Sequence, residues 1–334
     1  MKLVIATPLY PPEIGGPATY VQELEKGLPE HGIELIVVKF SDVRHLPKVV
    51  RHFAYYRRVL AALKRADAVL ALDPVSVGYP AHCAAQKLGK PLVVKIVGDY
   101  AWEQGVQRFG VTQMLDDFVH TKQGNIFVRL LQNLQTRVAK GARAIIVPSP
   151  YLKDTVSLWG ILPEKITVIY NGISIPPDIP APEKREGEFL IVSAGRRVPW
   201  KGFEAIERIA RIHGWKAFIA SGLSRSEALG WMKAADVFVL NSRYEGFPHA
   251  LIEAMTLGTP VIATDTRFHR ELLNHGETGL LVTPGDDDAL ERALTEVQRD
   301  PLAAHKRAHA ARKRVEDFSL SHMLNSTAVF LNHI

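Results

Sequence analysis

The 334-residue chain has a single cysteine, Cys83, so it has no disulfide framework, CxxC motif or thiolate zinc site. No apolar run reaches the roughly 18 residues that a membrane-spanning helix needs. The 13 histidines form no HExxH motif and no cluster with the spacing of metal ligands. The nucleophile motif GxSxG is also missing. These absences argue against a disulfide-rich module and an integral membrane protein, and they predict no metal site.

The composition is that of an ordinary globular protein, with 47% hydrophobic and 23% charged residues. The 41 basic and 35 acidic residues give a net charge of +6, which is too small and too dispersed to indicate a nucleic-acid-binding protein. The length predicts about two domains. The apolar start, Met1–Tyr10, runs into Pro11 and Pro12, so we expect a buried strand and turn rather than a signal peptide, and a cytoplasmic location.

Short runs rich in Val, Ile and Leu alternate with longer helical patterns, which predicts parallel sheets with helices on both faces. The strands expected in the first half are Leu3–Ala6, Glu34–Phe40, Ala68–Leu72, Leu92–Val97, Ala144–Val147 and 166–169. Those expected in the second half are Phe189–Ser193, Ala217–Ala220, Val237–Leu240, Pro260–Ala263 and Gly279–Val282. The predicted architecture is α/β, with two doubly wound domains facing a cleft and ligands beyond the carboxyl ends of the strands.

A proline-rich loop, residues 176–182, separates the two halves. Proline and charge replace the apolar periodicity there, so we place the boundary just before it. The predicted domains are residues 1–170 and 171–316.

The segment SRYEGFPHALIEAM, residues 242–255, follows an expected strand and opens a helix near Pro248. Glu245 precedes that helix and Glu253 lies about a turn and a half inside it, so both can face a ligand at the helix start. The backbone from Gly246 onward would face an anion there. The alternative for Glu253 is a solvent-facing helical stripe.

A second post-strand loop, SAGRRVPWKGF, carries three basic residues, Arg196, Arg197 and Lys201. An Arg fork and a Lys point charge can stabilise a departing diphosphate without a metal ion. The alternative is three exposed basic residues on a surface loop.

Two further post-strand turns stand in the first half. Gly15 and Gly16 let the backbone approach a ligand closely, although the dinucleotide fingerprint GxGxxG is missing. Asp99 follows Gly98 at the end of a strand, where it can orient a hydroxyl nucleophile or accept its proton. Capping of the following turn is the alternative role for Asp99.

The helix expected over Val49–Arg65 combines an apolar stripe with basic residues and no acid. The stripe consists of Val49, Phe53, Tyr56, Leu60 and Leu63. Such a helix suits an anionic lipid surface or a polyanion. The alternative is an ordinary helix that docks on its sheet and turns a basic face outward.

Taken together, these motifs resemble those of glycosyltransferase family 4, retaining enzymes of the GT-B fold. The resemblance runs through almost the whole chain. Its most specific part is the pair Glu245-x7-Glu253, followed by the sequence LGTPVIAT. Gly195-Arg196 with Lys201 resembles the diphosphate-binding loop of the family. The sequence YNGI at residues 170–173 resembles its interdomain link, and Gly15-Gly16 resembles its N-terminal glycine pair.

The resemblance implies a role for each of these residues. Arg196 and Lys201 would hold the donor diphosphate and stabilise it as it leaves, whereas Glu245 would contact the donor sugar and Glu253 the ribose hydroxyls. Gly16 would place its amide near the phosphates or the acceptor. The donor-binding set also includes Gly15, Gly222, Gly246 and Phe247. Asp99 stands where many members have a histidine near the acceptor.

The family also implies front-face attack by an acceptor hydroxyl, no metal ion and no cofactor beyond a UDP- or GDP-sugar co-substrate. A helix over 317–331 would pack back on the first domain. Only 35 positions separate Lys201 from Asp236, so a strand–helix unit is expected to be missing and residues 221–223 to recognise the base.

The expected function is therefore transfer of a sugar to a glycan or a lipid-linked acceptor, with peripheral contact to an anionic membrane through residues 48–65 and no nucleic-acid partner. Two alternatives remain: a GT-B epimerase or phosphorylase, and a non-catalytic nucleotide-sugar-binding protein.

Overall fold

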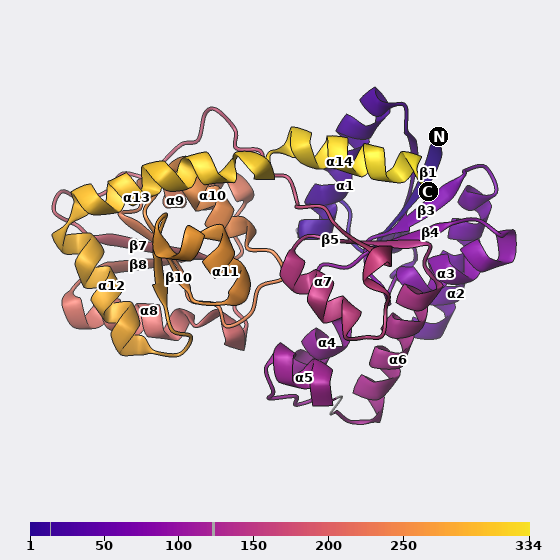
Figure 1. Cartoon of the computed structure of the whole chain (residues 1–334), viewed down its shortest axis with the longest axis horizontal. Helices are drawn as coiled ribbons and strands as arrows, with labels where there is room; N and C mark the ends of the chain where they lie inside the picture. The colour runs from indigo at the N-terminus through magenta and orange to yellow at the C-terminus, as the bar shows by residue number, and fades with distance from the viewer. Residues whose placement is uncertain (14, 122–123) are drawn as a thin grey trace. The chain divides into compact units, whose positions relative to one another are not determined.

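The computed structural model describes residues 1–13, 15–121 and 124–334, and of Val49 only the backbone. The chain forms two compact units (Figure 1). Unit 1 contains residues 1–171 and 320–334, and unit 2 contains residues 172–319. Each unit is built on its own parallel sheet, as the alternating pattern predicts.

Unit 1 has a six-stranded sheet in the order β2-β1-β3-β4-β5-β6. Its four inner strands are largely buried apolar runs, which is typical of a parallel sheet covered on both faces. The strands are β1 (Lys2–Thr7), β2 (Glu34–Lys39), β3 (Ala68–Ala71), β4 (Leu92–Lys95), β5 (Ala144–Val147) and β6 (Ile166–Val168). The helices are α1 (Gly16–Gly27), α2 (Lys48–Leu63), α3 (Gly78–Leu88), α4 (Tyr100–Arg108), α5 (Leu115–Thr121), α6 (Ile126–Gly141) and α7 (Pro150–Ser157).

The C-terminal helix α14 (Leu320–Asn332) also belongs to unit 1, where it lies beside α1 (Figure 1). Met323, Ala328 and Leu331 of α14 join the core formed by β1, α1 and β3. The helix therefore covers one face of the first sheet although it comes from the other end of the chain.

Helix α2 buries only part of the predicted stripe: Leu63 is fully buried as predicted, but the rest of the buried face is formed by other residues. Tyr55 and Val59 are fully buried, and the Tyr55 hydroxyl donates a hydrogen bond of 2.8 Å to the carbonyl of Val38. Phe53 is 61% exposed and Val50 is 50% exposed, so apolar side chains lie on the outer, basic face of the helix. The side chain of Val49, part of the predicted stripe, lies outside what the structure describes.

Unit 2 has a five-stranded sheet in the order β11-β10-β9-β7-β8. Its strands are β7 (Leu190–Ala194), β8 (Lys216–Ala220), β9 (Val237–Leu240), β10 (Val261–Thr264) and β11 (Leu280–Val282). Its helices are α8 (Phe203–His213), α9 (Arg225–Ala234), α10 (His249–Leu257), α11 (Arg267–Leu272), α12 (Asp287–Arg299) and α13 (Pro301–Arg314). Strand β8 is at the edge of the sheet and leads directly into α9. Beyond β8, the described part of unit 2 adds no further strand to this sheet, as the short spacing between Lys201 and Asp236 predicts.

The strand order places a switch point in unit 2 between β7 and β9. From β7 the chain moves to one side, to β8, and it then returns to the other side, to β9. The loops that follow β7 and β9 therefore diverge around a crevice at the carboxyl ends of these strands, where doubly wound sheets bind ligands. These two loops carry Arg196, Lys201 and Glu245.

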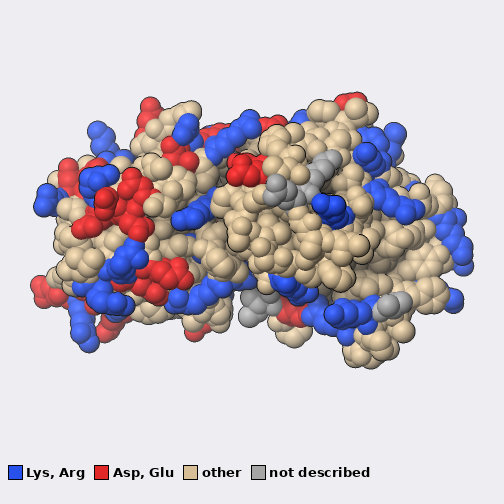
Figure 2. Space-filling model, turned by 90° about the horizontal axis from the view of Figure 1, so that it is seen from below, with Lys and Arg blue, Asp and Glu red and all other residues tan. Residues whose placement is uncertain are grey.

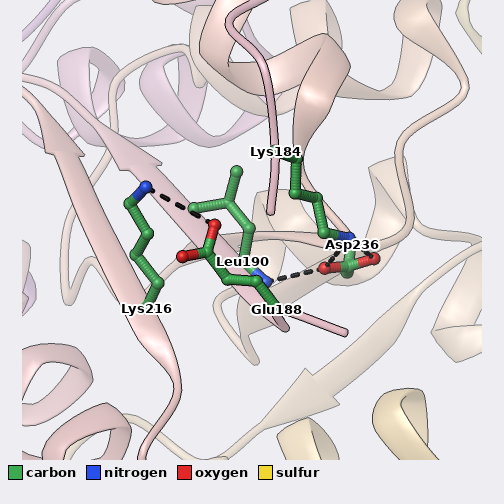
Figure 3. Close-up of polar contacts among 5 residues, drawn as sticks. All are labelled: Lys184, Glu188, Leu190, Lys216 and Asp236. Atoms are coloured by element: carbon green, nitrogen blue, oxygen red, sulfur yellow. Dashed lines mark hydrogen bonds and ion pairs between the residues drawn. The ribbon is translucent and has the colours of Figure 1, made fainter. Parts of the chain in front are cut away.

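At the opposite ends of the strands, Asp236 fixes the start of β7 (Figure 3). Its carboxylate accepts a hydrogen bond of 2.6 Å from the Leu190 amide and pairs with Lys184 at 2.5 Å. Nearby, Lys216 pairs with Glu188 at 3.4 Å. The side chains of Lys184 and Asp236 are each about 30% exposed, so water screens most of the attraction between their charges.

We expect Asp236→Ala to lower the free energy of unfolding by about 1–3 kcal/mol, because the Leu190 amide loses its charged acceptor. Lys184→Ala removes the ion pair alone and is expected to cost less than about 1 kcal/mol. Urea unfolding of both variants checks the difference. Equal losses in the two variants would contradict this assignment.

The excess of basic charge belongs entirely to unit 1. Unit 1 contains 21 Lys and Arg against 14 Asp and Glu, whereas unit 2 contains 20 against 21. On the face shown in Figure 2, the charged side chains of unit 1 (right) are mostly blue, whereas those of unit 2 include both signs. No helix in the described part of the chain is both long and apolar enough to cross a bilayer.

Candidate functional site

The structure brings Lys201 and Glu245 together across the switch point of unit 2. The Lys201 Nζ lies 2.5 Å from the Glu245 Oε1. Both side chains are largely withdrawn from water, at 14% and 13% exposed. At this position the ammonium can stabilise an anionic part of a ligand, and the carboxylate can stabilise a part that gains positive charge.

Close packing of the two loops holds this pair in place. The Asn241 side-chain amide donates a 3.0 Å hydrogen bond to the Gly202 carbonyl, and the Arg243 amide donates one of 2.9 Å to the Trp200 carbonyl. Gly195 has a φ of +141°, and a Cβ there would lie 3.3 Å from the Lys201 Nζ. The glycine before Arg196 therefore leaves the room that the Lys201 side chain occupies.

The two arginines of this loop differ in their surroundings. Arg197 pairs with Glu207 of α8 at 3.0 Å and lies over the Phe203 ring. Arg196 is exposed at the carboxyl end of β7. The structure thus binds Arg197 to a neighbouring helix and leaves Arg196 on the surface at the predicted diphosphate site.

The loop after β9 joins α10, which begins at His249 directly after Pro248. Gly246 and Phe247 are buried in this loop. The Phe247 ring packs against Phe268 at 5.8 Å and against His249 at 4.9 Å between ring centroids. Phe247 thus belongs to an aromatic cluster in this loop. Glu245 precedes α10 in the chain, and the N-terminus of a helix is the positive end of its dipole.

Glu253 is not on a solvent-facing stripe. Its side chain is 12% exposed, and its Oε1 accepts a hydrogen bond of 2.9 Å from the Nε of Arg225. Burial raises the pKa of Glu253, whereas the Arg225 charge opposes this. The guanidinium of Arg225 also donates to the Ser174 carbonyl at 2.9 Å. The partnership of Arg225 with Glu253 was not predictable from the sequence, because 28 positions separate the two residues.

A second residue that the sequence analysis missed is His269, which is fully buried on α11. Its Nδ1 lies 2.9 Å from the Thr264 carbonyl, so this nitrogen carries the proton and donates it. Burial lowers the pKa of His269, while the charge of Glu245 acts in the opposite direction. Its Nε2 has no hydrogen-bond partner among the described residues. A neutral imidazole thus lies close to the charged pair. The available signal was its position in the first turn of the helix that follows β10.

The structure gives Asp99 the capping role. Its Oδ1 accepts hydrogen bonds from the Trp102 amide at 2.9 Å and from Gln135 at 3.1 Å. Its Oδ2 accepts one from Trp159 at 3.1 Å. The residue is 1% exposed, and burial raises its pKa. Both carboxylate oxygens therefore take part in hydrogen bonds inside unit 1. We assign Asp99 the role of capping the start of α4 rather than of orienting a hydroxyl nucleophile.

The remaining predicted residues are glycines at two helix starts. Gly15 and Gly16 open α1 of unit 1, and a Cβ on Gly15 would meet the Leu9 side chain at 2.8 Å. Gly222 has a φ of +76° in the turn between β8 and α9. Within residues 1–13, 15–121 and 124–334, no group of three or more His, Cys, Asp or Glu could hold a metal ion.

Comparison with known proteins agrees with this arrangement. The model of the Glycosyltransferase Family 4 matches residues 14–175, and that of Glycosyl transferases group 1 matches residues 216–314. A glycogen synthase of Mycobacterium tuberculosis is 28% identical over 297 residues, which cover 79% of this chain and 68% of the relative.

Solved structures show the same fold. The sucrose-phosphate synthase of Thermosynechococcus elongatus has a TM-score of 0.76 at 17% identity, over 99% of this chain and 98% of its own. Anabaena HepE in complex with UDP-glucose has a TM-score of 0.73 at 17% identity, over the whole of both chains.

The two parallel-sheet units define a glycosyltransferase of the GT-B fold. Its two halves match the models of Glycosyltransferase Family 4 and of Glycosyl transferases group 1, in agreement with the resemblance of its sequence motifs.

Proposed function

We propose that this glycosyltransferase moves a hexose from a UDP- or GDP-sugar to a hydroxyl of a glycan or lipid-linked acceptor, with retention of configuration and without a metal ion or other cofactor. The Lys201–Glu245 pair at the switch point of unit 2 is the observation that carries this proposal. The presence of UDP-glucose in the structure of Anabaena HepE is consistent with a nucleotide-sugar donor.

In this proposal, Lys201 and Arg196 stabilise the diphosphate as it leaves. When the bond from the anomeric carbon to the phosphate oxygen breaks, that oxygen gains negative charge. The buried ammonium of Lys201 is placed before the reaction and lies in a site of low dielectric, where a charge stabilises a transition state most effectively. Arg196 adds a fork of donors for the phosphate oxygens.

Glu245 serves the opposite charge. In the ligand-free protein, Lys201 neutralises it. Once the diphosphate attracts Lys201, the Glu245 carboxylate faces the sugar, whose anomeric centre gains positive charge as the leaving group departs. The acceptor oxygen then bonds to that carbon on the same face, and its proton passes to the departing phosphate oxygen.

The nucleoside end of the donor would lie farther along α10 and α9. Glu253 accepts hydrogen bonds from the ribose hydroxyls, and the turn of residues 221–223, which includes Gly222, contacts the base. Gly246 and Phe247 hold the loop between the two glutamates, and Gly15 and Gly16 of unit 1 approach the phosphates or the acceptor.

Product analysis tests the reaction. The protein is incubated with UDP-glucose, GDP-mannose or ADP-glucose and a panel of glycan and lipid-linked acceptors, and the products are examined by NMR. The proposal predicts equal amounts of nucleoside diphosphate and an α-linked glycoside from the α-linked donor. A β-linked product would overturn retention. Epimerised donor without acceptor would indicate an epimerase, consumption of phosphate a phosphorylase, and binding without turnover a binding protein.

We also propose that unit 1 contacts the anionic inner face of the cytoplasmic membrane through α2, where the acceptor would be lipid-linked. Exposed Phe53 and Val50 lie on a helix whose basic residues have no acidic neighbour in sequence from 43 to 66. The whole excess of positive charge belongs to this unit. Apolar side chains among cations are typical of surfaces that bind anionic lipid.

Replacement of Arg57, Lys64 and Arg65 by glutamine is expected to weaken binding to phosphatidylglycerol vesicles by at least about tenfold, since each cation contributes on the order of 1 kcal/mol. Co-sedimentation measures the change. Replacement of Lys306, Arg312 and Lys313 by glutamine, at exposed positions of α13 in unit 2, is the matched control. Unchanged binding of the α2 variant would overturn the membrane proposal.

A further inference from the structure

Arg225 contacts Glu253, the residue that we propose to bind the ribose of the donor. Two nitrogens of Arg225, Nε and Nη2, lie 2.9 Å from the same oxygen, Oε1 of Glu253. Both of these contacts fall on Oε1, and neither uses the other carboxylate oxygen, Oε2. One oxygen is therefore fixed by the guanidinium, and the second is left as an acceptor.

The position of Arg225 is explained by these partners and not by its own helix. It is the first residue of α9, whose start is secured by a capping box between Ser224 and Glu227. A cation at a helix N-terminus is opposed by the macrodipole. The bonds to Glu253 and to the Ser174 carbonyl offset this cost and hold the guanidinium from two sides.

The short second domain brings Arg225 to this place. Because β8 is the edge strand, the chain passes through residues 221–224 directly into α9. Helices α9 and α10 pack side by side (Figure 1), so the first residue of α9 meets Glu253 on α10. An additional strand and helix after β8 would separate the end of β8 from α9 in the chain.

We propose that Arg225 is a positioning residue for the nucleoside of the donor, since it orients the Glu253 carboxylate so that the second oxygen accepts the ribose hydroxyls. This inference rests on the proposed function and deepens it. Arg225 acts through Glu253 and contacts no reacting atom.

The test compares ribonucleotides with nucleotides that lack the ribose hydroxyls. Calorimetry measures the affinities of UDP and GDP and of their 2′,3′-dideoxy counterparts for the wild-type protein and for Arg225→Ala, Arg225→Lys and Glu253→Gln. The wild type is expected to prefer the ribonucleotide by about tenfold or more, because hydrogen bonds to a charged acceptor are strong.

In Arg225→Ala this preference is expected to fall to about twofold or less, through loss of ribonucleotide affinity alone. Arg225→Lys keeps one charged contact and is expected to restore part of the preference. Glu253→Gln is expected to abolish the preference for the ribonucleotide. Adding Arg225→Ala to Glu253→Gln is expected to cause no further loss of ribonucleotide affinity. Arg211→Ala, on an exposed position of α8, is the control and keeps the wild-type preference.

The outcomes separate this inference from the proposed function. If the wild type binds none of the nucleotides, the proposed function fails and this inference fails with it. If the wild type prefers ribonucleotides and Arg225→Ala retains that preference, or loses affinity equally for both kinds, only the role of Arg225 is overturned. Arg225→Lys decides the question should the alanine variant not fold.

Discussion

Replacement of Lys201 by alanine is expected to lower kcat/KM for sugar transfer by about 10²–10³-fold, the cost typical of losing one preorganised group that stabilises developing charge. The substitution removes the ammonium that lies 2.5 Å from Glu245. It also leaves a carboxylate that is only 13% exposed without its counter-ion beside an anionic ligand. Steady-state release of nucleoside diphosphate in the presence of acceptor measures the loss.

Arg197→Ala is the matched control for this experiment. Arg197 lies on the same loop, but Glu207 of α8 holds it, so its loss is expected to change kcat/KM by less than about threefold. A Lys201→Ala variant that folds normally and keeps wild-type kcat/KM would show that the pair does not take part in transfer.

Replacement of Lys95 by methionine is expected to stabilise the protein near neutral pH by about 3 kcal/mol or more. Lys95 ends β4, is 2% exposed and has no hydrogen-bond partner among the described residues for its Nζ, which lies 4.2 Å from the centre of the Tyr20 ring. Burial lowers the pKa of Lys95 to about 7, from 10.5. The cation–π contact with Tyr20 offsets only part of this cost.

The pH dependence follows from the sign of this shift. Between pH 7 and pH 10.5 the Lys95 side chain is protonated in the unfolded chain and neutral in the folded protein. Folding therefore releases a proton in this range, and the destabilisation caused by Lys95 decreases as the pH rises. The advantage of Lys95→Met over the wild type is therefore expected to shrink by about 3 kcal/mol between pH 7 and pH 9.5.

Urea unfolding at both pH values measures this difference, and Lys87→Met, at an exposed position of α3, is the control. An advantage of Lys95→Met that stays constant over this range would contradict a lowered pKa for Lys95.

The strands and the two doubly wound sheets were predictable because buried parallel strands are continuous apolar runs between helical patterns. The loops that carry the site were predictable for a related reason. In doubly wound sheets, ligands bind beyond the carboxyl ends of the strands, so polar residues and glycine in the loops that follow the strands are candidates for the site. Lys201 and Glu245 were identified in this way.

The buried face of α2 was not predictable from helical spacing. The predicted stripe contains Phe53 and Tyr56, but Tyr55, Val59 and Ala62 also recur at helical spacing, and the helix buries these three residues. The hydrogen bond from Tyr55 to the Val38 carbonyl belongs to the buried stripe, and it depends on a strand elsewhere in the sequence.

The surroundings of the charged residues were equally hidden in the sequence. Glu253 fitted a solvent-facing stripe and a ligand site equally well until the structure showed its contact with Arg225. Asp99 fitted a base and a helix cap, and the bonds to Gln135 and Trp159 show that it is enclosed. Such contacts join residues far apart in the chain, so spacing along the sequence does not reveal them.

The central claim is that the Lys201–Glu245 site of unit 2 binds a nucleoside diphosphate. Its most direct test is a calorimetric titration of UDP, GDP and ADP into the wild-type protein, Lys201→Ala and Arg197→Ala. The account predicts that one nucleotide binds to the wild type and to Arg197→Ala, and at least about tenfold more weakly to Lys201→Ala. Absence of binding to the wild type, or equal affinity in all three proteins, would contradict it.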